Sequence, residues 1–212
     1  MGNSRGIPRL GWAIAFLGAV TLAAFAFTSL KGTHPARIAA HLEPISKVPE
    51  FELTDQTGKP YGLADLNGKI WVGSFIFTRC QGPCPVISSR MAELNKKVER
   101  AGEGVELVSF SVDPEFDRPE VLAAYSAKLG ADPARWKFLT GSKEDIEAIV
   151  VKGLLQPLAK EPDGTPAHST RIVLVDREGR LRGYQDGLDP ESVQKLLMDI
   201  GDLMREDSTK KP

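Results

Sequence analysis

Apolar segments with strand character and apolar segments with helical spacing alternate along residues 48–204, and this alternation limits the choice of fold most strongly. We predict strands at 51–55, 69–78, 105–112, 136–139, 170–176 and 181–185, and helices at 85–101, 117–129, 142–152 and from residue 189 onwards. Such a pattern favours an α/β sandwich with a mixed central sheet. A segment of ~160 residues is long enough for one domain with its own core.

Residues at the ends of the predicted helices support these boundaries. Asp117, with Glu120 three residues later, predicts a capping box at the start of one helix, and Gly130 predicts its end. Ser142 predicts the N-cap of the next helix. The resulting order of strands and helices is that of thioredoxin-like domains, here with an insertion. We therefore expect a thioredoxin-like sandwich.

Residues 10–30 contain no charged side chain and are predicted to form one N-terminal transmembrane helix. As a helix this segment would span ~31 Å, which matches a bilayer core. Arg5 and Arg9 precede it, so a cytoplasmic N-terminus is favoured, with the rest of the chain outside. The alternative is a cleaved signal peptide, since residues 24–26 (AFA) fit a cleavage site.

The chain thus divides into five predicted parts. These are a short N-terminal segment (1–9), a transmembrane anchor (10–30), a tether (31–47), the thioredoxin-like domain (48–204) and a flexible tail (205–212). The 27 basic and 28 acidic side chains nearly balance, which gives no support for a nucleic-acid partner, because such partners need a clustered basic surface.

Both cysteines of the chain, Cys80 and Cys84, lie between a predicted strand and the following helix. Pro83 and Pro85 fit a first helical turn, where amide hydrogens have no intrahelical partner. A helix N-terminus favours anions, so we predict a lowered thiol pKa at this corner. The thiolate is the form of cysteine that binds metals and attacks disulfides.

The spacing of the two cysteines leaves three interpretations open. Residues four apart on a helical turn face the same way, so the two sulfurs can converge on one metal ion or join each other. A structural disulfide is also typical of exported proteins, although so short a loop would contribute little stability. From the pair alone, a structural disulfide, a redox pair and a metal clamp remain alternatives.

The candidates for a third ligand are the three histidines of the chain. His34 and His41 lie in the tether and are expected to be solvated. His168 precedes the apolar strand 170–176; if that strand runs antiparallel beside strand 69–78, its start lies next to the end that carries Cys80. Two thiolates and one imidazole suit copper, whereas a structural zinc site needs four protein ligands. On sequence alone a loop histidine is more often exposed than a ligand.

Four motifs resemble the SCO/SenC family: FIFTRCQGPCP, SVDPEFDRPEVLAAY, WKFLTG and HSTRIVLVDREGRL. These are membrane-anchored, thioredoxin-like copper proteins of cytochrome c oxidase assembly, and the resemblance covers residues 48–204. It implies that Cys80, Cys84 and His168 bind copper, as Cu(I) or Cu(II), and that the two cysteines also form a redox-active disulfide. The implied function is a non-enzymatic metallochaperone that delivers copper to the dinuclear copper centre of an oxidase subunit.

The resemblance also implies alternatives. The domain could be an exported thiol-disulfide oxidoreductase that keeps the cysteines of the copper-centre subunit reduced, or a sensor of copper or redox state. Further expected partners are another copper chaperone or a thiol reductant. Peroxidase activity is disfavoured, because peroxiredoxins place a threonine three residues before the cysteine, whereas Thr78 lies two residues before Cys80.

Two positions near the implied ligands have special interest. Asp113 matches an acidic position of the family, where it could support the copper ligands; equally, it could simply form a turn before Pro114. Ala167 departs from the family, which often has an acidic residue before the histidine. The expected location is the bacterial inner (cytoplasmic) membrane, single-pass, with the domain facing the periplasm or cell exterior; the alternative is the mitochondrial inner membrane, facing the intermembrane space.

Overall fold

The computed structural model describes residues 42–101, 104–160, 162 and 166–210. Its internal contacts group His41–Pro212 into one compact unit, to which the following description applies. The predicted anchor at 10–30 and the first 11 residues of the predicted tether lie outside the described residues. Within the described ranges, no helix has the length and hydropathy that crossing a membrane requires.

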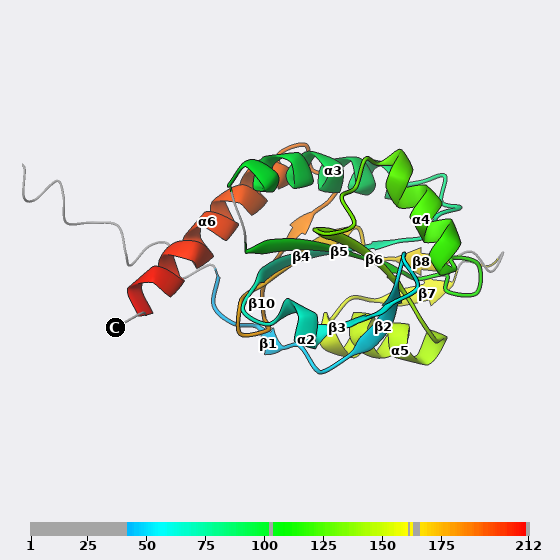
Figure 1. Cartoon of the computed structure of the whole chain (residues 1–212), viewed down its shortest axis with the longest axis horizontal. Coiled ribbons are helices and arrows are strands. Elements are labelled where there is room, and N and C mark those ends of the chain that lie inside the picture. Colours follow the sequence, from blue (N-terminus) through cyan, green and yellow to red (C-terminus); the bar gives the residue numbers. More distant parts are fainter. Residues whose placement is uncertain (1–41, 102–103, 161, 163–165, 211–212) are drawn as a thin grey trace, which may run out of the picture. The chain divides into compact units, whose positions relative to one another are not determined.

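The centre of the unit is a mixed eight-stranded sheet with the strand order β1-β10-β9-β4-β5-β6-β2-β3 (Figure 1). Its strands are β1 (Ser46–Lys47), β2 (Glu52–Asp55), β3 (Pro60–Gly62), β4 (Ile70–Ile76), β5 (Val105–Ser111), β6 (Trp136–Thr140), β9 (Arg171–Val175) and β10 (Arg180–Asp186). The β4–β5 and β5–β6 pairs are parallel, and the other neighbouring pairs are antiparallel. The predicted mixed sheet is therefore confirmed.

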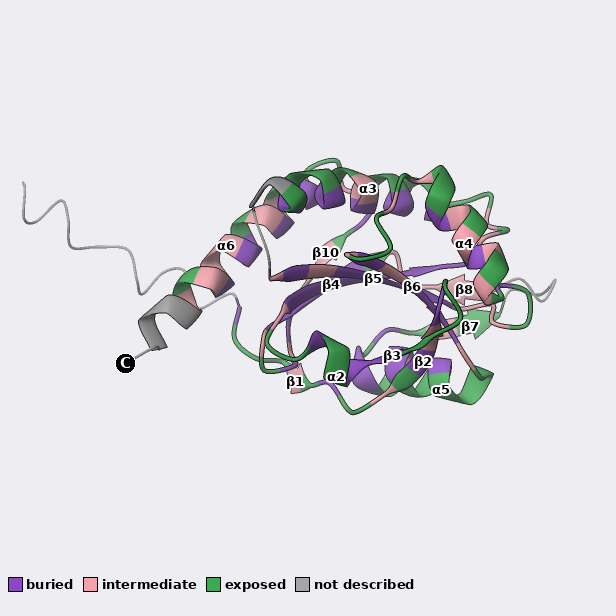
Figure 2. Ribbon diagram, in the orientation of Figure 1, coloured by how far each residue is buried: buried purple, intermediate pink, exposed green. Residues whose placement is uncertain are grey.

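Helices cover both faces of this sheet (Figure 1). On one face lie α3 (Cys84–Ala101), α4 (Pro119–Lys128) and α6 (Ser192–Lys210), and on the other lie α2 (Leu63–Leu66), α5 (Lys143–Glu147) and the π-helix η1 (Ala148–Gly153). Figure 2 shows that buried residues are concentrated in the central strands and on the helix sides that face them.

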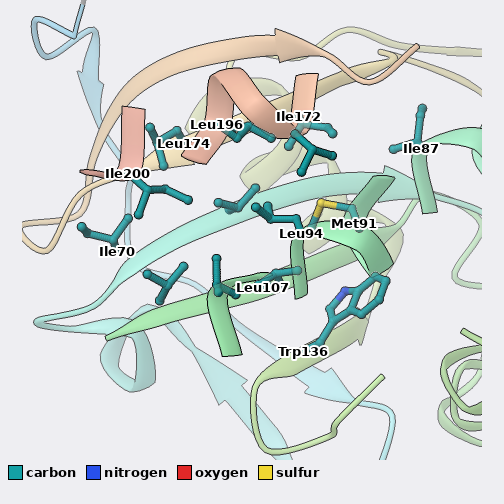
Figure 3. Packing of buried hydrophobic residues seen from close by; sticks show 14 of the residues in the cluster. Ile70, Ile87, Met91, Leu94, Leu107, Trp136, Ile172, Leu174, Leu196 and Ile200 are labelled. Atoms are coloured by element: carbon teal, nitrogen blue, oxygen red, sulfur yellow. The ribbon is translucent and has the colours of Figure 1, made fainter. Parts of the chain in front are cut away.

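Two apolar cores hold the layers together, one on each face of the sheet. In the first, Met91 and Leu94 of α3 and Leu196 of α6 pack over Ile70 and Leu174 of the sheet (Figure 3). All of these side chains are at most 1% exposed. Burial of a single large apolar side chain stabilises a fold by roughly 1.5–3 kcal/mol, so this layer fixes α3 on the sheet.

Strands β4 and β9 bring distant parts of the sequence to one corner. They pair antiparallel, with Trp71 opposite Val175 and Gly73 opposite Val173. The carboxyl end of β4 therefore lies beside the start of β9, as expected from the sequence. All seven residues of β4 are buried, which is why its apolar run has no alternation.

The boundaries differ from prediction in several places, including the last helix, which begins at Ser192 and not at residue 189. The two residues of β1 pair with β10, so the sheet includes residues 46 and 47 of the predicted tether. Helix α6 continues to Lys210, past the predicted domain end at residue 204. A separate hairpin, β7 (Leu158–Lys160) with β8 (Pro166–His168), has no counterpart among the predicted strands, because its two strands of three residues are too short to show a period.

The capping prediction for α4 is wrong. The N-cap is Arg118, and the Asp117 carboxylate turns away to accept hydrogen bonds from Thr78 and Ser111. The Ser142 cap is confirmed, because its hydroxyl accepts a hydrogen bond from the Asp145 amide at 3.1 Å. Gly130 also follows α4 as predicted, with the positive φ of +66° that favours glycine.

Candidate metal centre

The two cysteines occupy the corner between β4 and α3. Cys84 is the first residue of α3 and is fully buried, whereas Cys80 lies in the preceding loop and is partly exposed. The Pro83 carbonyl accepts hydrogen bonds from the amides of Val86 and Ile87, which closes the first turn. Pro85 thus lies in the first helical turn as predicted, whereas Pro83 directly precedes the helix. Both cysteines are free thiols.

His168 reaches this corner from the end of β8. Its Nε2 lies 3.1 Å from the Cys84 Sγ. Its Nδ1 lies 2.8 Å from the Ser169 carbonyl oxygen, which can only accept, so Nδ1 carries the proton. The Nε2 lone pair therefore points to Cys84. The Phe77 ring packs edge-to-face against the imidazole, with 5.8 Å between the two ring centres, and so limits the movement of the imidazole.

Burial keeps both groups uncharged. Burial, together with a hydrogen bond to the Cys80 side chain, raises the pKa of the Cys84 thiol well above its ordinary value. Burial also lowers the pKa of His168, which favours neutral imidazole. The prediction that the helix N-terminus lowers the thiol pKa is therefore wrong for Cys84, because the loss of hydration outweighs the helix dipole.

Cys84 contacts His168 at 3.1 Å, and the Cys80 side chain is close enough to help raise the pKa of the Cys84 thiol. Across the described part of the chain, no three His, Cys, Asp or Glu side chains already stand in the arrangement of a metal site. Loss of the two thiol protons would nevertheless convert Cys80, Cys84 and His168 into three electron-pair donors. Two sulfurs with one imidazole nitrogen form a soft ligand set, which suits copper.

Asp113 contacts the corner through Arg79. The Asp113 Oδ2 lies 2.6 Å from Nη2 of Arg79, the residue directly before Cys80. The same guanidinium lies 4.3 Å from the centre of the Phe116 ring. Asp113 is thereby paired with the residue before Cys80, and it also forms a turn, because its carbonyl accepts hydrogen bonds from the amides of Phe116 and Asp117.

Sequence reasoning missed Asp117, the second acidic side chain at this corner. It is fully buried and accepts hydrogen bonds from the Thr78 amide at 3.0 Å, the Thr78 hydroxyl at 2.5 Å and the Ser111 hydroxyl at 2.6 Å. These bonds fix the chain two residues before Cys80. In the sequence, the same residue fitted a helix cap, so no separate signal marked its role.

Fold and site together define a thioredoxin-like protein with a cysteine pair and a histidine at one corner of its sheet. The family model described as SCO1/SenC matches residues 39–205. The chain therefore belongs to the SCO1/SenC family.

Relatives agree with this assignment. A SCO1 protein homolog of Bacillus subtilis (strain 168) is 32% identical over 157 residues, which are 73% of this chain and 81% of the homolog. The structure of BsSco, a member of the Sco family of cytochrome c oxidase assembly proteins in which a disulfide switch is identified, is 31% identical with a TM-score of 0.68, covering 76% of this chain and 95% of BsSco. Copper-bound ScoI of Bradyrhizobium japonicum is 26% identical with a TM-score of 0.62, covering 76% of this chain and 99% of ScoI.

Proposed function

We propose that this protein is a copper chaperone of cytochrome c oxidase assembly that holds its cargo through Cys80, Cys84 and His168. One observation carries the ligand set: the Nε2 lone pair of His168 points to the Cys84 sulfur at 3.1 Å, while Nδ1 is committed to the Ser169 carbonyl. Such an outer hydrogen bond fixes the tautomer of a metal-binding histidine. Membership in a family with a copper-bound ScoI supports copper as the cargo.

Copper binding would replace protons at this corner. Each cysteine must lose its proton to bind, so metal uptake releases protons and becomes stronger as pH rises. Burial disfavours an isolated thiolate at Cys84, whereas a thiolate bound to a copper cation has its charge compensated. The free Cys84 thiol is thereby kept uncharged until metal arrives.

Oxidation of the same two sulfurs would prevent copper binding. Joining them as a Cys80–Cys84 disulfide would release two protons and two electrons to a disulfide-bearing oxidant, which becomes two thiols. The disulfide leaves no thiolate for copper, and bound copper leaves no thiol to oxidise. The disulfide switch identified in BsSco is consistent with this proposal.

Delivery is proposed to the dinuclear copper centre of an oxidase subunit, from a domain tethered outside the membrane by residues 10–30. The inner membrane of a bacterium, with the domain in the periplasm or at the exterior, remains the proposed location; the mitochondrial inner membrane is the alternative. The alternative function, a thiol-disulfide oxidoreductase acting on the subunit's cysteines, is not favoured. The copper-bound structure of the related ScoI supports a role in copper binding instead.

A copper titration tests the ligand set. The full chain, reduced and kept in a mild detergent, is titrated anaerobically with Cu(I) and separately with Cu(II), beside His168→Ala and the matched control His34→Ala in the tether. The proposal predicts one tightly bound copper for the wild type and for His34→Ala. It predicts that His168→Ala loses the tight site; tight binding that is indifferent to His168 would contradict it.

A further inference from the structure

A groove of about 420 Å³ adjoins the candidate metal centre. One wall is the β7–β8 hairpin, through Ala159 and Ala167; another is formed by Val112 and Pro114, directly after β5. Ala167 precedes His168, and Val112 and Pro114 flank Asp113 on either side. The groove lining therefore includes the sequence neighbours of His168 and Asp113.

Part of the groove lining is apolar. It includes Ile146 of α5, which is buried, and Leu158 of β7, which is half-buried. The two facing residues of the hairpin, Ala159 and Ala167, are paired in register and carry only methyl groups. The volume lies within the range of roughly 300–1,000 Å³ that binding pockets occupy, so the space can receive several apolar side chains.

Among the described residues that line the groove, the charged ones are Lys143, Lys160 and Glu147. Lys143 and Lys160 are exposed at its edge, and neither forms an ion pair with another described residue. Glu147, on the same wall as Lys143, supplies the opposite charge. Two lysines against one carboxylate favour an occupant that carries an acidic group.

We propose that this groove docks the protein that accepts copper, through an extended segment with apolar side chains flanked by an acidic residue. The inference rests on the proposed function, since it assigns the acceptor's docking surface beside the same site. Transfer between thiol ligand sets requires both sets to be held close together while ligands exchange. A segment seated along Ala167 lies next to His168 and so presents its chain to the copper ligands.

Charge reversal tests the surface without touching the ligands. The full chain in mild detergent is compared with Lys143→Glu/Lys160→Glu and with the matched control Lys59→Glu/Lys128→Glu, which reverses two exposed lysines away from the groove. A third variant, Ala159→Phe, fills the groove. The probe is the purified soluble copper-centre domain of the oxidase subunit from the same organism, with its cysteines reduced.

Both groove variants are expected to weaken the complex with the probe about tenfold or more, whereas the control pair leaves its Kd unchanged. Their Cu(I) affinity and their rate of copper loss to a small chelator should equal those of the wild type. An unchanged Kd in Lys143→Glu/Lys160→Glu, or no complex with the wild type, would overturn the proposal. A groove-dependent complex in which His168→Ala still binds copper tightly would instead support the groove and refute the proposed ligand set.

Discussion

The Cys84 sulfur and the His168 Nε2 lie 3.1 Å apart, although 84 residues separate them in sequence. Antiparallel pairing of β4 with β9 produces this contact, because it places the end of one strand beside the start of the other. The contact is a hydrogen bond from a protonated thiol to a neutral imidazole.

The two thiols of the reduced, metal-free chain should differ in reactivity. Cys84 is fully buried and its pKa is raised by that burial, whereas Cys80 is partly exposed. Iodoacetamide at neutral pH should therefore modify Cys80 first, with Cys84 slower by about tenfold or more. Peptide mass spectrometry measures both rates, and unfolding in urea should make them similar. Faster labelling of Cys84 in the folded chain would refute this description of the corner.

Asp117→Asn should destabilise the corner by about 2 kcal/mol, because an amide cannot accept all three hydrogen bonds that the carboxylate accepts. Copper should leave the variant for a chelator about tenfold faster, since the loop before Cys80 loses its anchor. Urea unfolding and copper-transfer kinetics measure the two effects. Asp132→Asn, at an exposed turn where its carboxylate accepts one amide hydrogen bond, is the matched control and should change neither.

Asp113→Asn should accelerate copper loss. It should leave the Tm nearly unchanged, because the Arg79 side chain of the Arg79–Asp113 ion pair is 56% exposed, and exposed ion pairs contribute little stability. The effect is expected to pass through Arg79, so Arg79→Gln should have the same consequence. Stopped-flow transfer to a chelator measures it. If Asp113→Asn weakens copper binding and Arg79→Gln does not, Asp113 acts directly on a ligand and the Arg79 account fails.

Asp176→Asn should cost about 3 kcal/mol, since it leaves Arg182, only 3% exposed, without one of its two carboxylate partners. Burial alone would raise the pKa of Asp176, but hydrogen bonds from Arg182 and Arg180 hold it below its ordinary value of 3.8. A carboxylate whose pKa is lower in the folded than in the unfolded chain stabilises the fold at pH values above its unfolded-state pKa. This contribution is lost as the pH falls through its folded-state pKa.

Urea unfolding across a pH series measures this contribution. The gap in unfolding free energy between wild type and Asp176→Asn should be full at neutral pH and shrink only below about pH 4. Equal stability of the two proteins at neutral pH would show that the Asp176–Arg182 pair contributes nothing.

The parts of the fold that sequence could predict are those with strong, local patterns. The fully buried run of β4 and the helical spacing of Ile87, Met91 and Leu94 in α3 are sufficient to locate both elements. The cysteine pair was found for the same reason, because its prolines and its strand are contiguous. The position of His168 near the cysteines could be predicted only on the assumption that β9 runs antiparallel to β4.

Other features depend on contacts that no local pattern contains. The β7–β8 hairpin that carries His168 is defined by a ladder of three residue pairs, so its strands are too short for a period. Asp117 has the chemistry of a helix cap, and only Thr78, 39 residues earlier, decides that it serves as a buried acceptor instead. The raised pKa of Cys84 follows from burial by the whole domain, which outweighs the local helix dipole.

X-ray absorption of the copper-loaded full chain tests the central claim most directly. Comparison of the wild type with His168→Ala and His34→Ala reports which atoms surround the metal. The account predicts two sulfur neighbours and one imidazole nitrogen in the wild type and in His34→Ala, with the imidazole signal lost in His168→Ala. The same copper surroundings with and without His168, or fewer than two sulfur neighbours, would contradict it.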